Sequence, residues 1–249
     1  MSTSITPERN MIDIHMHLIP GVDDGAENME MALAMMIRAR QQGISQIITT
    51  PHSEVFRYSK EGGKIIFKRL VDAAAKVCPD MKLYLGCEVY CEARIMDQVL
   101  VDLNTGRYPT MNGSEYVLME FSMYAEPEGA LSCVEAMVNA GYKPVIAHME
   151  RYRNLYDNMD LVNRFRELGA LIQINVYSLF DEDKDSIKNW ARRLVQERKA
   201  DFLGTDAHRT YHRPPSATWG LNWLYENVDR GYADAITWGN ARKLLQTTI

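Results

Sequence analysis

The sequence predicts an α/β protein whose parallel strands form a closed or nearly closed barrel. Seven short apolar or β-branched runs alternate with segments of helical periodicity, an order typical of parallel βα units. Seven such units in one chain favour a barrel over a doubly wound open sheet. Five of the six histidines lie at or just after the carboxyl end of a candidate strand. This end of the barrel is therefore where we expect the functional site.

The candidate strands follow one another at regular intervals, at 11–15, 45–50, 82–87, 115–121, 143–148, 170–175 and 201–205. Apolar residues recur with helical spacing in segments that include 28–42, 62–77, 128–140, 158–168 and 183–199. Glycine follows three of these segments, at Gly43, Gly141 and Gly169, where the end of a helix favours it.

Composition excludes several classes of protein. The chain has 249 residues, 46% of them hydrophobic, which suffices for one large core. Its formal net charge of −5, without a dense run of Lys or Arg, argues against a nucleic-acid partner. The first residues lack a secretion signal, and no apolar run approaches the roughly 20 residues needed to cross a bilayer. We therefore expect a cytoplasmic protein without membrane insertion.

The four cysteines are predicted to be packing residues. They are scattered through candidate helices and strands, which suits a reducing compartment better than a disulfide framework. A cysteine-based phosphatase needs a reactive thiolate in a C-x5-R loop, and no cysteine of this chain precedes an arginine at that spacing.

The first candidate strand ends in the pattern His15-Met16-His17. Side chains two residues apart on an extended strand point to the same side, so both imidazoles should face the barrel mouth. Asp13 shares that face and is a candidate partner that orients an imidazole. For this pair alone, two hydrogen-bonded histidines remain an equally good explanation.

Further ligand-type side chains follow the other strands. Glu88 and Glu120 stand among apolar neighbours, where an unpaired carboxylate is costly, so each should have a cation or a hydrogen-bonding partner. The complete candidate set is His15, His17, Asp24, His52, Glu88, Glu120, His148, Asp206 and His208. Each of these nine side chains, taken alone, could be a hydrogen-bonded or solvated residue without a metal. Their recurrence at the ends of successive strands, on one face of the barrel, favours a shared metal site.

The residue types in this set indicate the kind of metal. Imidazole and carboxylate without thiolate favour manganese, iron or zinc. Nine ligands exceed the needs of one ion and suit two or three, an arrangement that can generate a bridging hydroxide and neutralise a phosphoryl group.

Seven motifs also carry a resemblance to a known group of proteins. They are D-I-H-x-H at 13–17, V-D-D-G at 22–25, T-P-H at 50–52, G-x-E-x-Y at 86–90, L-M-E-F at 118–121, A-H-x-E-R-Y at 147–152 and D-A-H at 206–208. The chain resembles the PHP (polymerase and histidinol phosphatase) superfamily and, more narrowly, the CpsB/CapC-type tyrosine-protein phosphatases of bacterial capsule and exopolysaccharide loci. The match begins at residue 11, which implies an N-terminal extension over 1–10 and a single PHP-type barrel domain over 11–249.

The resemblance implies a distorted seven-stranded (β/α)7 barrel that holds three metal ions, commonly manganese, at the carboxyl ends of its strands. The same nine residues match the ligand positions, and only the resemblance favours Asp24 over Asp23. The phosphate-contacting arginines would be Arg151 and Arg213, although Arg209 and His212 are alternatives to Arg213. A metal-bridging hydroxide would attack the phosphorus of phosphotyrosine.

The resemblance further implies, as substrate, the tyrosine-rich tail of a bacterial tyrosine kinase that controls polysaccharide export. A small-molecule phosphoesterase such as a histidinol-phosphate phosphatase would share every ligand and differ in its substrate pocket. An amidohydrolase would usually carry a bridging lysine after a middle strand, and none stands there. A non-enzymatic relative tends to have lost ligands, whereas this set is complete. Self-association is left open.

Overall fold

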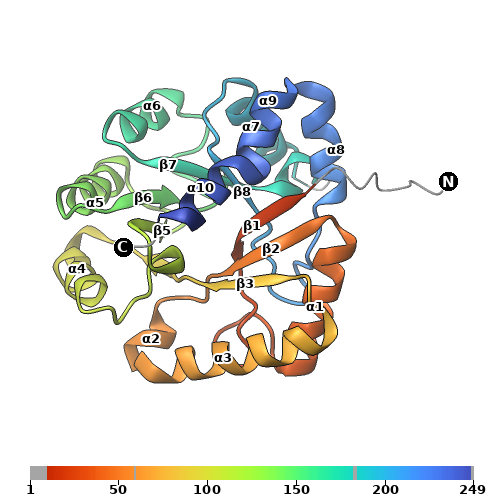
Figure 1. Cartoon of the computed structure of the whole chain (residues 1–249). Coiled ribbons are helices and arrows are strands. Elements are labelled where there is room, and N and C mark those ends of the chain that lie inside the picture. Colours follow the sequence, from red (N-terminus) through yellow and green to blue (C-terminus); the bar gives the residue numbers. More distant parts are fainter. Residues whose placement is uncertain (1–9, 59, 182–183, 248–249) are drawn as a thin grey trace.

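The computed structural model describes residues 10–58, 60–181 and 184–247. Its short parallel strands are surrounded by helices (Figure 1). One sheet has the order β1-β2-β3 and the other the order β4-β5-β6-β7-β8. The strands are β1 Met11–Met16, β2 Ile44–Thr49, β3 Lys82–Leu85, β4 Glu88–Tyr90, β5 Tyr116–Glu120, β6 Lys143–Ile146, β7 Leu171–Asn175 and β8 Phe202–Gly204. Most of the expected N-terminal extension, residues 1–9, lies outside the described residues.

The third candidate strand is broken in two. β3 ends at Leu85 and pairs with β2, whereas β4 begins at Glu88 and pairs with β5. Between them the amide of Gly86 donates to the carbonyl of Thr49 at 2.8 Å, so this segment still follows β2. The α/β class and parallel order are confirmed. The single seven-stranded barrel is not, because the described residues form eight strands in two sheets.

The two sheets meet at their edges through isolated parallel bridges. Met16 pairs with Ala207 beyond β8, and His52 beyond β2 pairs with Glu88. Around the first junction, the amide of Asp206 donates to the carbonyl of His15 at 2.7 Å. The carboxyl ends of both sheets therefore open at the same place.

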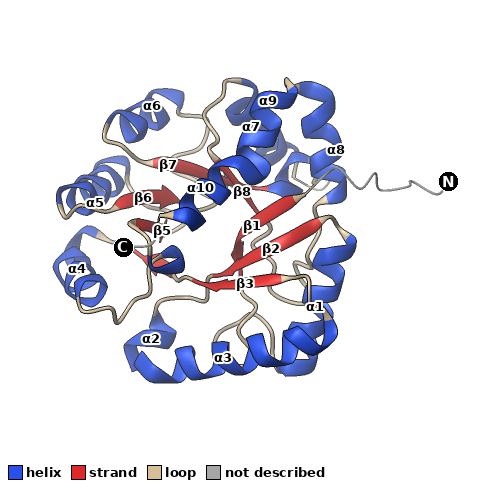
Figure 2. Ribbon diagram, in the orientation of Figure 1, coloured by secondary structure: helices blue, strands red, loops and turns tan. Residues whose placement is uncertain are grey.

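The helices lie between and around the strands in Figure 2. They are α1 Met29–Gln41, α2 Glu54–Tyr58, α3 Lys60–Val77, α4 Met96–Asn104, α5 Pro127–Asn139, α6 Met159–Glu167, α7 Asp185–Gln196, α8 Thr218–Asn227, α9 Arg230–Asp234 and α10 Asn240–Gln246. Short 3-10 turns are η1 Ala93–Ile95, η2 Met111–Gly113, η3 Met149–Arg151 and η4 Val176–Leu179, and η5 Ala235–Gly239 is a π-helical turn. The predicted helices all appear, and Gly43, Gly141 and Gly169 adopt φ of 85° to 100° just beyond α1, α5 and α6.

Two apolar clusters hold this arrangement together. The larger packs helices such as α1, α5 and α7 against the strands and includes the buried Trp190 and Phe165. The smaller gathers strand residues such as Ile14 and Val145 with Leu244 of α10. Burial of a large apolar side chain contributes about 1.5–3 kcal/mol, so these clusters fix the strand ends that carry the polar residues. Among the described residues, no helix is long and apolar enough to span a membrane.

Candidate metal centre

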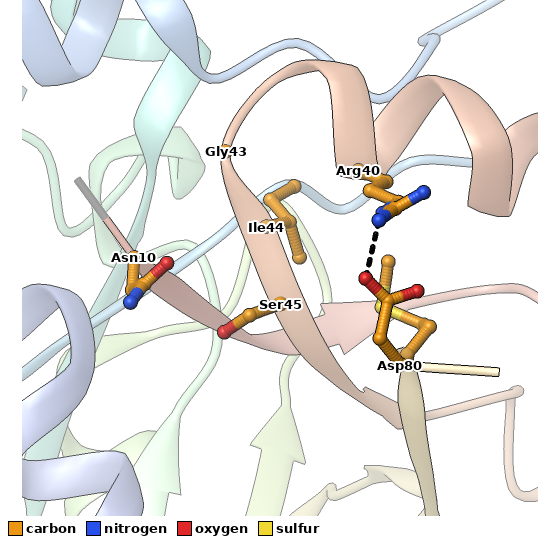
Figure 3. A pocket seen from close by; sticks show the side chains of 7 residues that line it. Asn10, Arg40, Gly43, Ile44, Ser45 and Asp80 are labelled. Carbon is orange, nitrogen blue, oxygen red and sulfur yellow. Dashed lines mark hydrogen bonds and ion pairs between the residues drawn. The ribbon is translucent and has the colours of Figure 1, made fainter. Parts of the chain in front are cut away.

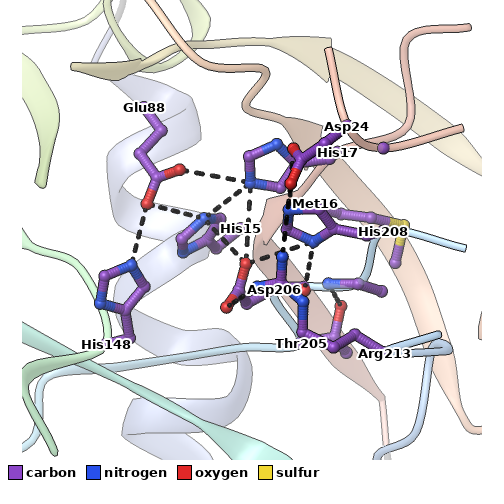
Figure 4. A network of polar contacts seen from close by, with 12 residues as sticks. His15, Met16, His17, Asp24, Glu88, His148, Thr205, Asp206, His208 and Arg213 are labelled. Carbon is purple, nitrogen blue, oxygen red and sulfur yellow. Dashed lines mark hydrogen bonds and ion pairs between the residues drawn. The ribbon is translucent and has the colours of Figure 1, made fainter. Parts of the chain in front are cut away.

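Glu88, the first residue of β4, points towards several imidazoles (Figure 4). Its Oε1 is 3.2 Å from His15 Nε2 and 3.1 Å from His148 Nε2. Its Oε2 is 3.3 Å from His17 Nε2 and 3.1 Å from His52 Nδ1. One buried carboxylate therefore faces four imidazoles that follow three different strands.

Asp206 and Asp24 extend the cluster towards His208. Asp206 Oδ1 lies 3.6 Å from His15 Nε2, 3.7 Å from His17 Nε2 and 3.5 Å from His208 Nδ1. Asp24 Oδ1 lies 3.3 Å from His208 Nε2. Asp24 is 58% exposed, whereas Asp206 is buried, so the cluster has a closed end and an open end.

Glu120, at the end of β5, joins the opposite side. Its Oε1 lies 3.5 Å from His148 Nε2 and its Oε2 lies 3.6 Å from His52 Nδ1. The structure thus brings together all nine side chains that the sequence singled out. The prediction that His15 and His17 point to one side is confirmed by the 3.3 Å between their Nε2 atoms.

The donor atoms fit divalent metal ions. Seven of the nine residues form three overlapping groups whose donors lie within 4.8 Å of one another, namely His17-Asp24-His52-His208, His15-His17-Glu88 and His52-Glu88-Glu120. Nitrogen and carboxylate oxygen donors without sulfur suit manganese, iron or zinc. The buried Nε2 of His208 faces Asp24 Oδ1 at 3.3 Å, so this nitrogen and this oxygen are placed to share a cation.

The backbone is strained where several of these residues leave their strands. His148, Asp206 and Arg213 have φ of 33°, 52° and 48°, a left-handed conformation that non-glycine residues rarely adopt. Each costs of order 1–3 kcal/mol and persists only where the surroundings enforce it. Here the amide of His148 donates to Gln173 Oε1 at 2.8 Å, and the amide of His208 donates to the carbonyl of Arg213 at 3.0 Å.

Two residues that sequence analysis did not identify as partners contact the Nδ1 atoms of His17 and His15 and so orient their rings. Asp23 Oδ2 accepts from His17 Nδ1 at 2.9 Å, which leaves His17 Nε2 to face the cluster. Gln173 Oε1 lies 3.1 Å from His15 Nδ1 and does the same for His15. Such contacts fix the tautomer and ring orientation of metal-binding histidines. Of the two adjacent acids, Asp23 thus orients the His17 ring, whereas Asp24 faces His208 inside the cluster.

The proposed role of Asp13 as an imidazole partner is wrong. Its carboxylate accepts from the amides of His15 and Thr205 and from the Thr205 hydroxyl. Asp13 therefore joins β1 to the end of β8. The prediction failed because a shared strand face fixes only the side on which the carboxylate lies, and the nearest donors on that side belong to the backbone.

The electrostatics of the cluster favour ionised carboxylates. Burial alone would raise the pKa of Glu88, but His15, His148 and His17 outweigh burial and hold it well below its usual range. Hydrogen bonds from His208 and His52 lower the pKa of Asp24. These carboxylates are therefore ionised at neutral pH, and positive charge must compensate them.

Two arginines border the cluster beside Asp206. Arg151, in η3, donates from Nη1 to Asp206 Oδ2 at 2.6 Å, and Arg213 donates from Nη1 to the same oxygen at 3.0 Å. Both guanidinium groups are about one-quarter exposed. They therefore present cationic donors at the surface of the cluster, where an anion can reach them.

The two alternatives to Arg213 lie differently. Arg209 Nε donates to the carbonyls of Asp24 and Gly25, and its Nη1 pairs with Glu27 at 2.7 Å, so its charge is already engaged. His212 lines a neighbouring pocket. Of these three residues, only Arg213 has a described contact with side chains of the donor cluster.

A different pocket, of about 220 Å³, lies at the opposite ends of the strands (Figure 3). It is lined by Asn10, Arg40, Gly43, Ile44, Ser45, Asp80 and Met81. Arg40 and Asp80 pair with each other there. Its described lining residues include no imidazole and no second carboxylate, so they do not repeat the chemistry found at the carboxyl ends.

With this geometry established, sequence comparison assigns the chain to a family. A family model described as "Capsular polysaccharide synthesis, CpsB/CapC" matches residues 11–246. The chain belongs to this family. Tyrosine-protein phosphatase CpsB of Streptococcus pneumoniae is 28% identical over 246 residues, which are 96% of this chain and 100% of that protein. Tyrosine-protein phosphatase YwqE of Bacillus subtilis is 33% identical over 211 residues, 82% of this chain and 79% of YwqE.

A solved structure extends this relationship to three dimensions. It comes from work on YwqE of Bacillus subtilis and CpsB of Streptococcus pneumoniae, described as unique metal-dependent tyrosine phosphatases. It superposes on this CpsB/CapC chain with a TM-score of 0.78 at 29% identity and covers 96% of each chain. The family resemblance carried by the motifs is thereby confirmed.

Proposed function

We propose that this CpsB/CapC-family protein is a metal-dependent protein-tyrosine phosphatase. The observation that carries the proposal is the contact of Arg151 and Arg213 with Asp206, because it sets two cationic donors at the edge of a dense cluster of metal-type ligands. A phosphoryl dianion needs this pairing of fixed guanidinium groups with metal ions. The activities named for CpsB and YwqE support the same function.

We assign the metal-binding role to nine residues: His15, His17, Asp24, His52, Glu88, Glu120, His148, Asp206 and His208. Their number suits two or three divalent ions, and we propose three on the family resemblance, with manganese the first to test and iron or zinc as alternatives. When bound, such ions supply Lewis-acid chemistry, which polarises phosphoryl oxygens and acidifies coordinated water.

The protein's own residues have distinct tasks in this proposal. Arg151 and Arg213 bind the phosphoryl oxygens and stabilise the charge that builds on them. Asp206 holds both guanidinium groups through one carboxylate oxygen. Asp23 and Gln173 keep the imidazoles of His17 and His15 turned towards the cluster. Tyrosinate, the conjugate base of a phenol with a pKa of about 10, leaves with little help from a general acid.

The finer predictions of the sequence belong to the same proposal. The substrate is a phosphotyrosine protein, for which we propose the tyrosine-rich tail of a bacterial tyrosine kinase in the cytoplasm. We also propose that the two sheets act as one distorted seven-stranded barrel, with β3 and β4 as halves of a single interrupted strand. The bridge between His52 and Glu88 supports this view, because it continues the pairing past the break.

The test compares three substrates: a phosphotyrosine peptide, the matching phosphoserine peptide and histidinol phosphate. Metal-stripped protein reloaded with manganese should release phosphate from the phosphotyrosine peptide, and a His148→Ala variant should not. Glu115→Ala is a suitable control, because Glu115 pairs with Lys143 at the opposite end of β6. Preference for histidinol phosphate would assign a small-molecule substrate, and no activity with any metal would contradict the phosphatase function.

A further inference from the structure

Next to the two arginines lies a second, larger pocket, of about 780 Å³. Arg151 and Arg213 line its inner end. Its remaining lining residues are Tyr177, Phe180, Asp181, Lys184, His212, Pro214, Ser216, Trp219 and Gly220. Pockets of this size typically accept a ligand of several groups, so the space exceeds what a phosphoryl group alone would fill.

Two exposed aromatic side chains form part of this pocket's lining. Phe180, just after η4, is 37% exposed, and Trp219, in the first turn of α8, is 54% exposed. Their rings stack with centroids 5.2 Å apart and an interplanar angle of 16°. Trp is enriched among the residues that dominate binding energy at interfaces, so this exposed and stacked pair is suited to contact a ligand.

Tight packing fixes the segments that carry these two rings. Gly220 lies so close to η4 that an added Cβ would stand 2.0 Å from the carbonyl oxygen of Val176, so only glycine permits this approach of α8. Glu150 accepts from the Ser178 hydroxyl at 2.8 Å, and Arg192 donates to the Leu179 carbonyl at 2.9 Å. The aromatic pair is therefore held in place before any ligand arrives, which lowers the entropic cost of binding.

Charged side chains are shared between the pocket and the proposed reaction site. Arg151 and Arg213 both contact Asp206 of the donor cluster and line the pocket, so these two side chains belong to both. Lys184 and His212 add basic groups, and Asp181 is the one acid among the lining residues that the structure describes. A phosphorylated side chain can thus place its phosphoryl group on the arginines while the attached polypeptide continues past Phe180 and Trp219.

We propose that this pocket, the aromatic groove, binds the substrate segment that flanks the phosphotyrosine, and that Phe180 and Trp219 stack on an aromatic or large apolar residue of that segment. The inference rests on the proposed tyrosine phosphatase function. It predicts that the enzyme selects phosphotyrosine sites with such a neighbour, since one stacked aromatic contact adds affinity beyond the buried area alone.

The test measures kcat and KM for a phosphotyrosine peptide series in which one flanking position at a time carries Tyr, Leu or Ser, and for p-nitrophenyl phosphate. Trp219→Ala should lower kcat/KM about tenfold, mainly through KM, for the best Tyr- or Leu-containing peptide. The Ser peptide and p-nitrophenyl phosphate should change less than about twofold. Trp219→Phe should restore most of the loss, because stacking survives.

A matched control and a binding measurement complete the design. Tyr124→Ala removes another aromatic residue, 60% exposed, which lines a separate pocket of about 400 Å³ and should leave peptide selectivity unchanged. Calorimetry with a peptide carrying a non-hydrolysable phosphotyrosine analogue should show the same loss of affinity in Trp219→Ala. Thermal melting and metal content of each variant check that the fold and the donor cluster are intact.

The outcomes separate the two proposals. Hydrolysis of p-nitrophenyl phosphate and all peptides with no dependence on Trp219 or on the flanking residue would overturn the groove and leave the phosphatase function standing. An effect at Tyr124 rather than at Trp219 would also overturn it. Failure of the wild-type protein on every phosphate ester would instead refute the phosphatase function on which the groove depends.

Discussion

Arg151 Nη1 lies 2.6 Å from Asp206 Oδ2, while the other oxygen of Asp206 faces His15 and His17. One carboxylate therefore connects the anion-binding edge of the site to its donor cluster. Burial alone would raise the pKa of Asp206, but His15, His148 and the two arginines hold it below its usual range. Asp206 is thus an anion at neutral pH, and the guanidinium groups stay attached to it.

This contact predicts a strong effect of a charge-conserving change at Arg151. Lysine lacks the planar fork that can bind Asp206 and a phosphoryl oxygen together. We expect Arg151→Lys to lower kcat/KM for a phosphotyrosine peptide by about 10²-fold, similar to the loss of one donor to a developing oxyanion. Steady-state kinetics and metal analysis would show low activity at unchanged metal content.

Arg153→Lys is the matched control for this prediction. Arg153 lies two residues further along the chain, over the ring of Tyr124, and has no described contact with the donor cluster. Its replacement should leave kcat/KM within about twofold, since surface substitutions are usually mild. Equal losses in the two variants would show that Arg151 has no special role in phosphoryl binding.

Substitutions of Asp13 and Asp23 should have different effects, one on the stability of the fold and the other on its affinity for metal. Asp23 holds the His17 ring, so Asp23→Asn should weaken metal binding by about 10–100-fold, with activity recovered at higher metal concentration. Asp13 holds backbone and hydroxyl groups of Thr205, so Asp13→Asn should lower the melting temperature and spare metal affinity. Metal titration and thermal melting of both variants give the comparison, and identical behaviour would contradict it.

Removal of metal should make stability depend on pH in a defined direction. Burial lowers the pKa of His17 and of His52, but Asp23 and Glu88 raise that of His17 to about 10, and Asp24 and Glu88 raise that of His52 to about 11. A histidine whose pKa is higher in the folded state than its unfolded value of 6.5 stabilises the fold by binding a proton. This stabilisation is fully present below pH 6.5 and is lost as the pH rises through 10–11.

We therefore expect the melting temperature of metal-free protein to fall as the pH is raised from neutrality towards 10, with a smaller fall in manganese-loaded protein. The loaded form is the control, because bound imidazoles carry no proton to lose. Calorimetry in buffers of different ionisation enthalpy should show proton release when metal binds near neutral pH. Proton uptake, or a steeper fall in the loaded form, would refute this account.

The cysteines should be unreactive. Burial, with smaller contributions from nearby acids, raises the pKa of the Cys87 thiol well above its usual range, and burial raises that of Cys133 to about 11. Both stay protonated at neutral pH, whereas alkylation needs the thiolate. Iodoacetamide at pH 7 should leave activity intact while it inactivates a cysteine-dependent phosphatase in parallel. Loss of activity in step with alkylation of Cys87, followed by mass spectrometry, would contradict this expectation.

The candidate metal ligands at the strand ends could be predicted because they are recognised from neighbouring residues in the sequence. The spacing of His15 and His17 fixes a shared side, and the motifs around His148 and His208 follow apolar strands directly. The break between β3 and β4 could not be predicted in this way. It depends on which strands pair on either side of Gly86, a choice made by residues far away in the sequence.

The residues that orient the histidines, Gln173 and Asp23, could not be identified from sequence for a different reason. Gln173 carries no charge and sits inside β7, so nothing in its sequence context distinguishes it from an ordinary strand residue. Asp23 and Asp24 are adjacent acids, and only the folded loop decides that one reaches the back of His17 and the other the open end of the cluster. Residue type indicates candidates, whereas long-range packing assigns their roles.

The distribution of the donors over the two sheets has a consequence for assembly of the protein in the cell. His15, His17 and His52 lie in or just after strands of the three-stranded sheet, whereas Glu88, Glu120, His148 and Asp206 lie in or just after strands of the five-stranded one. We therefore expect a nascent chain with only the first sheet formed to hold part of the proposed metal site and to bind metal weakly. On the proposed assignment, full metal binding would require both sheets to be formed, so an incompletely folded molecule would lack phosphatase activity.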